Sequence, residues 1–135
     1  MKYLTEENLE YVKKLEKDIK KEIERIKENR KKMNSDELNI LIMKLSKEAE
    51  KIEKERMNVY EEYDDFFNKF NNKFKDIDKL PEEQQKEMKK LYESEVKNIL
   101  TPIWKLFNDI ENTLSETLFI IRDTKRKILK KKYKV

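Results

Sequence analysis

Residues 36–78 read DELNILIMKLSKEAEKIEKERMNVYEEYDDFFNKFNNKFKDID, a stretch with neither glycine nor proline. Its apolar residues recur at steps of three and four, beginning with Leu38 and Leu41 and ending near Phe74. That spacing places them on one face of a helix. An unbroken helix of this length spans roughly 65 Å at ~1.5 Å per residue. The stretch therefore predicts a long rod rather than an element of a compact globular core.

The segments on either side of this rod predict two further long helices. The first helix is expected to begin near Thr5, a suitable N-cap residue. Asn34 with Glu37 three residues later resembles a capping box and marks the restart of the chain into the second helix. Pro81 is followed by acidic residues, as at the start of a helix. Thr101-Pro102 is expected to kink or break this third helix, which would give three or four helices.

The composition favours an elongated all-α fold. Only 36% of the residues are apolar and 46% are charged, which is typical of long helices and coiled coils when the apolar positions are periodic. We expect residues 1–135 to form a single domain, an antiparallel coiled-coil-like helical bundle. Residues 122–135 hold eight basic residues against one acidic residue, which is a net +7. The total of +4 then leaves −3 for residues 1–121.

Short turns between the long helices should make neighbouring helices antiparallel. A turn centred near residues 79–80 would set residues 38–45 beside residues 114–121, and both segments are apolar nearly all round. At that level the first helix offers only Ile26. Because one sparse stripe cannot cover two such segments, we expect a protein partner or a second copy of the chain to bury the surplus, with a homodimer favoured.

The same register predicts a two-helix arm, because the first helix should reach only to about residue 65 of the second. Four phenylalanines lie on this arm, and Phe66 is expected to be the least buried of the aromatic cluster. Aromatic residues at helical spacing are also common in bundle cores. The candidate partner-binding residues are Phe66, Phe67, Phe70, Phe74, Leu118, Phe119, Ile120, Ile121, Ile40 and Met43.

The chain has no glycine, no histidine and no cysteine. Glycine-rich phosphate loops, imidazole bases and thiolate nucleophiles are therefore excluded. The carboxylates within residues 61–65 lack the histidines of di-iron bundles and the glycine turn of calcium loops. We accordingly expect no catalytic residues, no metal site, no cofactor and no small-molecule substrate, and we expect that the protein is not an enzyme.

The basic end allows three interpretations. Its cations could simply be solvated at a helix C-terminus, where they favour the helix dipole. They could neutralise nucleic-acid phosphates without reading sequence. They could also bind an anionic membrane surface, since Ile128, Leu129 and Tyr133 lie among them. The candidate nucleic-acid or anion-binding residues are Lys125, Arg126, Lys127, Lys130, Lys131, Lys132 and Lys134.

These observations favour a non-catalytic protein-interaction module: an adaptor, a scaffold or a chaperone-like binder that presents apolar helix faces. The alternative is a nucleic-acid-associated accessory or regulatory protein, such as an inhibitor encoded by a phage or a mobile element. Peripheral membrane binding ranks third. The N-terminal residues are acidic and lack the apolar segment of a signal peptide, so we expect a cytoplasmic protein.

Overall fold

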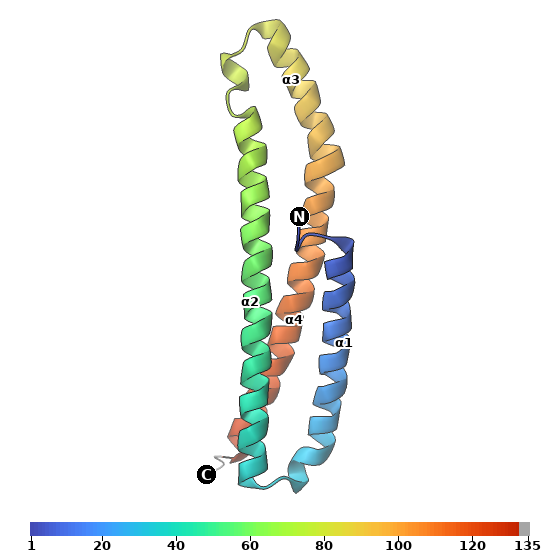
Figure 1. The fold of residues 1–135 in the computed structure, drawn as a ribbon, viewed down its shortest axis with the longest axis vertical. Helices are drawn as coiled ribbons and strands as arrows, with labels where there is room; N and C mark the ends of the chain where they lie inside the picture. The colour runs from blue at the N-terminus through green and yellow to red at the C-terminus, as the bar shows by residue number, and fades with distance from the viewer. Residues whose placement is uncertain (133–135) are drawn as a thin grey trace.

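The computed structural model describes residues 1–132 and has four α-helices that form three long rods (Figure 1). The helices are α1 (Glu6–Asn29), α2 (Ser35–Phe74), α3 (Glu82–Glu95) and α4 (Thr101–Lys132). Short 3₁₀ turns follow α1 and α2, at Arg30–Lys32 and Ile77–Lys79. The predicted all-α antiparallel bundle is confirmed.

Both predicted N-caps of the first two rods are present. The Thr5 hydroxyl accepts a hydrogen bond from the Asn8 N–H at 3.0 Å, and the Asn34 side-chain oxygen accepts one from the Glu37 N–H at 2.8 Å. These side chains bind N–H groups that have no partner within their own helix. The sequence therefore sets the start of each helix through local contacts.

The expected kink or break at Thr101-Pro102 is not confirmed, because α3 and α4 are joined by a π-helical turn, Val96–Leu100, into one continuous rod. In this turn the Thr101 N–H bonds to the Val96 carbonyl, five residues back instead of four. A proline in a regular α-helix clashes with the carbonyl four residues earlier. The wider π-helical turn removes that conflict at Pro102, and the irregularity precedes the proline.

The core lies along α4, because both α1 and α2 pack directly on this helix. Most of the buried apolar side chains come from the faces of α1 and α2 that meet α4. Those of α4 recur at helical spacing and are almost completely enclosed. They are Ile110, Leu114, Leu118, Ile121 and Ile128.

The predicted register between the second and third rods is wrong. Arg56 forms an ion pair with Glu111 at 2.7 Å, and Arg122 forms one with Glu53 at 3.2 Å. Residues 111–122 therefore lie beside the middle of α2 and not beside residues 38–45. The connection between α2 and α3 extends past the C-terminal end of α2 before the chain turns back (Figure 1). The first turns of α3 therefore have no α2 residues beside them. As a result, Tyr92 is the α3 residue that packs against Phe74.

The predicted two-helix arm is present. The N-terminal segment ends against α2 at Glu62, and above this level α2 faces only α3, the π-helical turn and the first turns of α4 (Figure 1). The two Glu62 carboxylate oxygens accept hydrogen bonds from the backbone N–H groups of Lys2, Tyr3 and Leu4, at 2.6 to 2.8 Å. This single side chain therefore anchors the chain start and fixes where the three-helix section ends.

Replacing Glu62 with alanine should lower the free energy of unfolding by about 1–3 kcal/mol, because three backbone donors lose their acceptor and Leu4, which is buried, loses its anchor. Urea unfolding followed by circular dichroism measures this difference. Glu61→Ala, at the exposed neighbouring position, is the control and should stay within about 0.5 kcal/mol of the wild type. Equal effects of the two substitutions would show that Glu62 is not an anchor.

Candidate interaction surfaces

The fold buries four of the predicted partner-binding residues within the chain itself. Leu118 and Ile121 are 2% and 0% exposed, so they belong to the core along α4. Phe70 and Phe74 are buried because they pack against Tyr92, with ring centroids 5.8 and 5.2 Å apart. The prediction that these residues contact a partner is corrected. Leu118 and Ile121 were expected at a partner surface because of a register that the structure does not adopt, whereas Phe70 and Phe74 lie on the predicted arm but are covered by Tyr92.

The remaining predicted partner-binding residues are partly or largely exposed to solvent. Ile40, Met43 and Phe119 are 67%, 62% and 69% exposed, and Ile120 is half-buried against α1. The expectation for Phe66 is wrong, because Phe67 is the more exposed of the two. Phe66 lies one helical turn beyond Glu62, on the face that the N-terminal segment approaches.

A group of exposed aromatic side chains follows the junction between α2 and α4. The Tyr60 hydroxyl donates a hydrogen bond to the Glu111 carboxylate at 3.1 Å. Two turns further along each antiparallel helix lie Phe67 and Trp104, so both are on the same side of this junction. Tyr60, Phe67 and Trp104 are 42%, 37% and 50% exposed. We call these three residues the aromatic seam.

Ring contacts support two members of the aromatic seam, Tyr60 and Phe67. The Tyr63 ring stacks on Phe107 with centroids 4.4 Å apart and on Phe67 at 6.0 Å, while Tyr60 meets Phe107 edge-on at 5.2 Å. Phe107 on α4 is thus held between two tyrosines of α2. Aromatic pairs in such geometries add to the energy of area burial, so Phe67 is held in place although it faces solvent.

The buried carboxylate of Glu111 fixes the end of the aromatic seam at Tyr60. Glu111 is 8% exposed, and its carboxylate accepts hydrogen bonds from Arg56 at 2.7 Å, Ser115 at 2.8 Å and Tyr60. Burial alone would raise the pKa of Glu111, but the hydrogen bonds from Ser115 and Arg56 outweigh it and hold the pKa below its ordinary value. The site is therefore a preorganised polar and aromatic surface.

Sequence reasoning missed Trp104, the chain's single tryptophan. The sequence does not show that Trp104 is exposed or that Glu111 is buried, because both depend on how α4 is aligned along α2. Exposed Leu91, Tyr92 and Ile99 on the arm were not singled out as surface residues for the same reason.

The bundle end opposite the arm is more basic than residues 122–135 alone indicate. The Lys131 ammonium donates a hydrogen bond to the Arg30 carbonyl at 3.2 Å, which brings the α1–α2 turn and the end of α4 together. Asp123 pairs with Arg126 and Lys127. Among the side chains that the structure describes, Lys125, Lys130 and Lys131 of α4 and Arg30, Lys31 and Lys32 of the turn form no ion pair. We call this group the basic end: Arg30, Lys31, Lys32, Lys125, Lys130 and Lys131.

Not all of the sequence-predicted residues at this end lie on a described surface. Ile128 is fully buried, so it cannot insert into a membrane. Tyr133 and Lys134 lie outside the described residues, as does the side chain of Lys132. None of the helices within residues 1–132 combines the length and apolar character needed to cross a bilayer.

A cleft of about 200 Å³ lies between α1 and α2, and two carboxyl groups lie close together in its lining. Glu22 forms an ion pair with Lys44 at 2.8 Å. Burial and the neighbouring charge of Glu22 raise the pKa of Glu48 to about 7, and a proton on Glu48 allows it to donate a hydrogen bond to Glu22. Asp18 and Lys51 complete the charged lining. Within residues 1–132, no cluster of three or more potential metal ligands occurs.

No family model, curated protein or solved structure matches this chain. The aromatic seam, the basic end and the cleft are therefore judged on their own geometry. Of these three, the aromatic seam combines exposed aromatic area with rigid support.

The Glu48 pair should make stability depend on pH. The pKa of Glu48 is about 7 in the folded chain and about 4.5 when unfolded. The folded state therefore binds the extra proton, and the free energy of unfolding falls as the pH rises from about 4.5 to about 7. Glu48→Gln keeps the neutral hydrogen-bonding form, so it should equal the wild type near pH 4, below the unfolded pKa, and exceed it at pH 8 by about 1 kcal/mol, after allowance for solvent screening.

Urea unfolding of both proteins at several pH values measures this difference. Glu10→Gln, at an exposed position of α1 outside the cleft, is the matched control and should leave the pH dependence of the wild type unchanged. A Glu48→Gln protein whose stability follows the wild-type curve at every pH would contradict a shared proton in this cleft.

Proposed function

We propose that the protein is a non-catalytic interaction module, an adaptor or chaperone-like binder that docks a helical segment of a protein partner on the aromatic seam. The observation that carries the proposal is the half-exposure of Phe67 and Trp104 on a supported two-rod platform. Large aromatic side chains supply most of the energy at protein interfaces and lose little conformational entropy when they bind.

The shape of the surface favours a helix as the docked segment. An amphipathic helix can lay its apolar face along exposed aromatic side chains at the junction of two rods. The Glu111 network gives this surface a polar edge, which can orient the docked segment. The absence of histidine and cysteine from the chain supports a binding role rather than a catalytic one.

The double substitution Phe67→Ser/Trp104→Ser should abolish retention of the native partner while leaving helicity unchanged, because both side chains are already partly solvated. The test is a pull-down from the native host, followed by titration of the retained protein. Wild-type Trp104 emission should shift to the blue when the purified partner binds, since this residue is the only tryptophan. Phe119→Ser is the control, because Phe119 is exposed elsewhere on α4.

An identical set of retained proteins with the wild type and with the double variant would contradict docking on the aromatic seam. A partner that binds without any change in Trp104 emission would contradict it as well.

A second candidate function is nucleic-acid binding through the basic end, in accord with the alternative that the sequence raised. The supporting observation is that two cationic segments about a hundred residues apart meet there, at the contact between Lys131 and Arg30. Each phosphate that is neutralised adds roughly −0.9 to the slope of log affinity against log salt on duplex DNA. Both segments should therefore contribute to this slope.

Replacing Arg30, Lys31 and Lys32 with glutamine should lower the magnitude of this salt slope by roughly 2–3, because up to three phosphate contacts are lost. Binding of a labelled DNA duplex at several salt concentrations measures it. Glutamine at Lys13, Lys14 and Lys17, on exposed positions of α1, is the charge-matched control. Equal losses in the two variants would show general electrostatic attraction rather than a site.

A further inference from the structure

A second stripe of residues runs along α2 on the face that points away from the other two rods. Its positions alternate in steps of three and four, which is the spacing of a coiled-coil contact. The three large apolar members, Ile40, Met43 and Met57, are 67%, 62% and 56% exposed. We call this set the outer stripe: Ile40, Met43, Lys47, Glu50, Lys54 and Met57.

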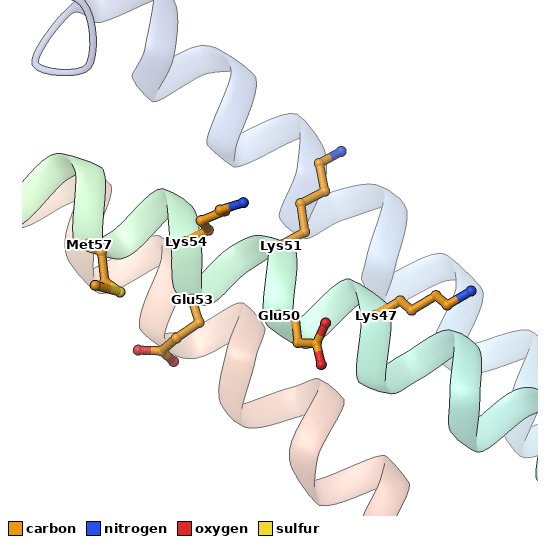
Figure 2. A pocket seen from close by; sticks show the side chains of 6 residues that line it. All are labelled: Lys47, Glu50, Lys51, Glu53, Lys54 and Met57. Atoms are coloured by element: carbon orange, nitrogen blue, oxygen red, sulfur yellow. The ribbon is translucent and has the colours of Figure 1, made fainter.

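The neighbours of the outer stripe mark its two sides. Figure 2 shows Lys47, Glu50, Lys54 and Met57 along α2, where they line a shallow depression. Glu53 forms an ion pair with Arg122 of α4, and Lys51 lines the cleft shared with α1. Both residues also line the depression, where they mark its borders toward α4 and α1, and the exposed outer stripe lies between them.

The outer stripe is complementary to itself when two copies run antiparallel. If the two-fold axis passes between residues 48 and 49, Ile40 faces Met57 of the second copy, and Lys47 faces its Glu50. Met43 faces the aliphatic stem of Lys54, which can cover an apolar side chain. A parallel pairing in register would instead set Lys47 against Lys47 and Glu50 against Glu50, and like charges at such positions are unfavourable.

We propose that the outer stripe is the contact of an antiparallel, two-fold symmetric homodimer. The occupant of this face is a second copy of the chain, because in an antiparallel pair each Lys47 faces a Glu50 and the charges are complementary. The contact ends at Asp36 and Glu61, where like charges of the two copies face each other in solvent. Each copy contributes only three large apolar side chains, so the association is weak and concentration-dependent.

The proposed dimer has a consequence for the arms. Because residues 40–57 lie in the half of α2 away from the arm, the two arms extend from opposite ends of the dimer. If the aromatic seam binds a partner as proposed above, the dimer presents two such seams and gains affinity for a partner with two matching segments. The dimer itself does not depend on the aromatic seam, so the two proposals can fail separately.

Charge reversal tests the central pairs. Lys47→Glu and Glu50→Lys should each raise the dimer dissociation constant about tenfold, because each replaces two attractive pairs per dimer with two like-charge contacts. The double substitution Lys47→Glu/Glu50→Lys restores opposite charges with unchanged net charge, so it should recover the wild-type constant. Sedimentation equilibrium over a range of concentrations measures all four proteins. A wild type that stays monomeric, or a double variant as weak as the single ones, would overturn the proposal.

Cysteine cross-linking tests the orientation, since the chain has no native cysteine. An Ile40→Cys protein mixed with a Met57→Cys protein should form a disulfide-linked heterodimer under mild oxidation. Neither protein alone should do so, because like positions lie roughly 25 Å apart at ~1.5 Å per residue. Rapid cross-linking of either protein with itself would overturn the antiparallel arrangement. The Phe67→Ser/Trp104→Ser variant should dimerise like the wild type, and loss of its dimer would place the contact on the aromatic seam instead.

Discussion

The apolar face of α4 organises the molecule, because it is wide enough to receive two other helices at once. Ile110, Leu114 and Ile121 are each fully enclosed. The hydroxyl of Thr117, also buried, bonds to the backbone carbonyl one turn earlier, so it adds no unpaired polar group to this face. Since α1 and α2 both rest on α4, the outward faces of these two helices stay free to carry charge or surface features.

The unequal lengths of the three rods then divide the molecule into two sections with different surfaces. Where all three rods run together, apolar side chains find partners on two neighbours. Beyond Glu62 there are only two rods, and burial there depends on rings that pack across one interface, such as Phe70 and Phe74 against Tyr92. A two-rod section cannot enclose aromatic side chains on every side, which is why Phe67 and Trp104 remain partly solvated.

The sequence predicted those features that depend on local physics. The N-caps at Thr5 and Asn34 and the length of α2 follow from short-range signals, and the arm follows from the lengths of the helices. Features that depend on the alignment of α4 along α2 were not predictable. The connection after α2 extends past the end of that helix before the chain turns back, which shifts this alignment. This shift buried Leu118 and Ile121, which had been expected at a partner surface. The π-helical turn before Pro102 was not predicted either. A proline indicates a steric clash in a regular α-helix, but a kink, a break or a π-helical turn can each relieve it.

The polar contacts between rods explain why this register, once formed, is held in place. A shift of α4 along α2 by one turn would separate Glu111 from Arg56 and leave a buried carboxylate without its hydrogen-bond donors, which costs far more than the loss of an exposed ion pair. The apolar stripes alone would tolerate such a shift, because Leu and Ile at steps of three and four present a similar face in either position. The Glu111 network therefore supplies specificity that the apolar core lacks. Because the same network holds Tyr60, the register of the bundle and the position of the aromatic seam are fixed by one set of contacts.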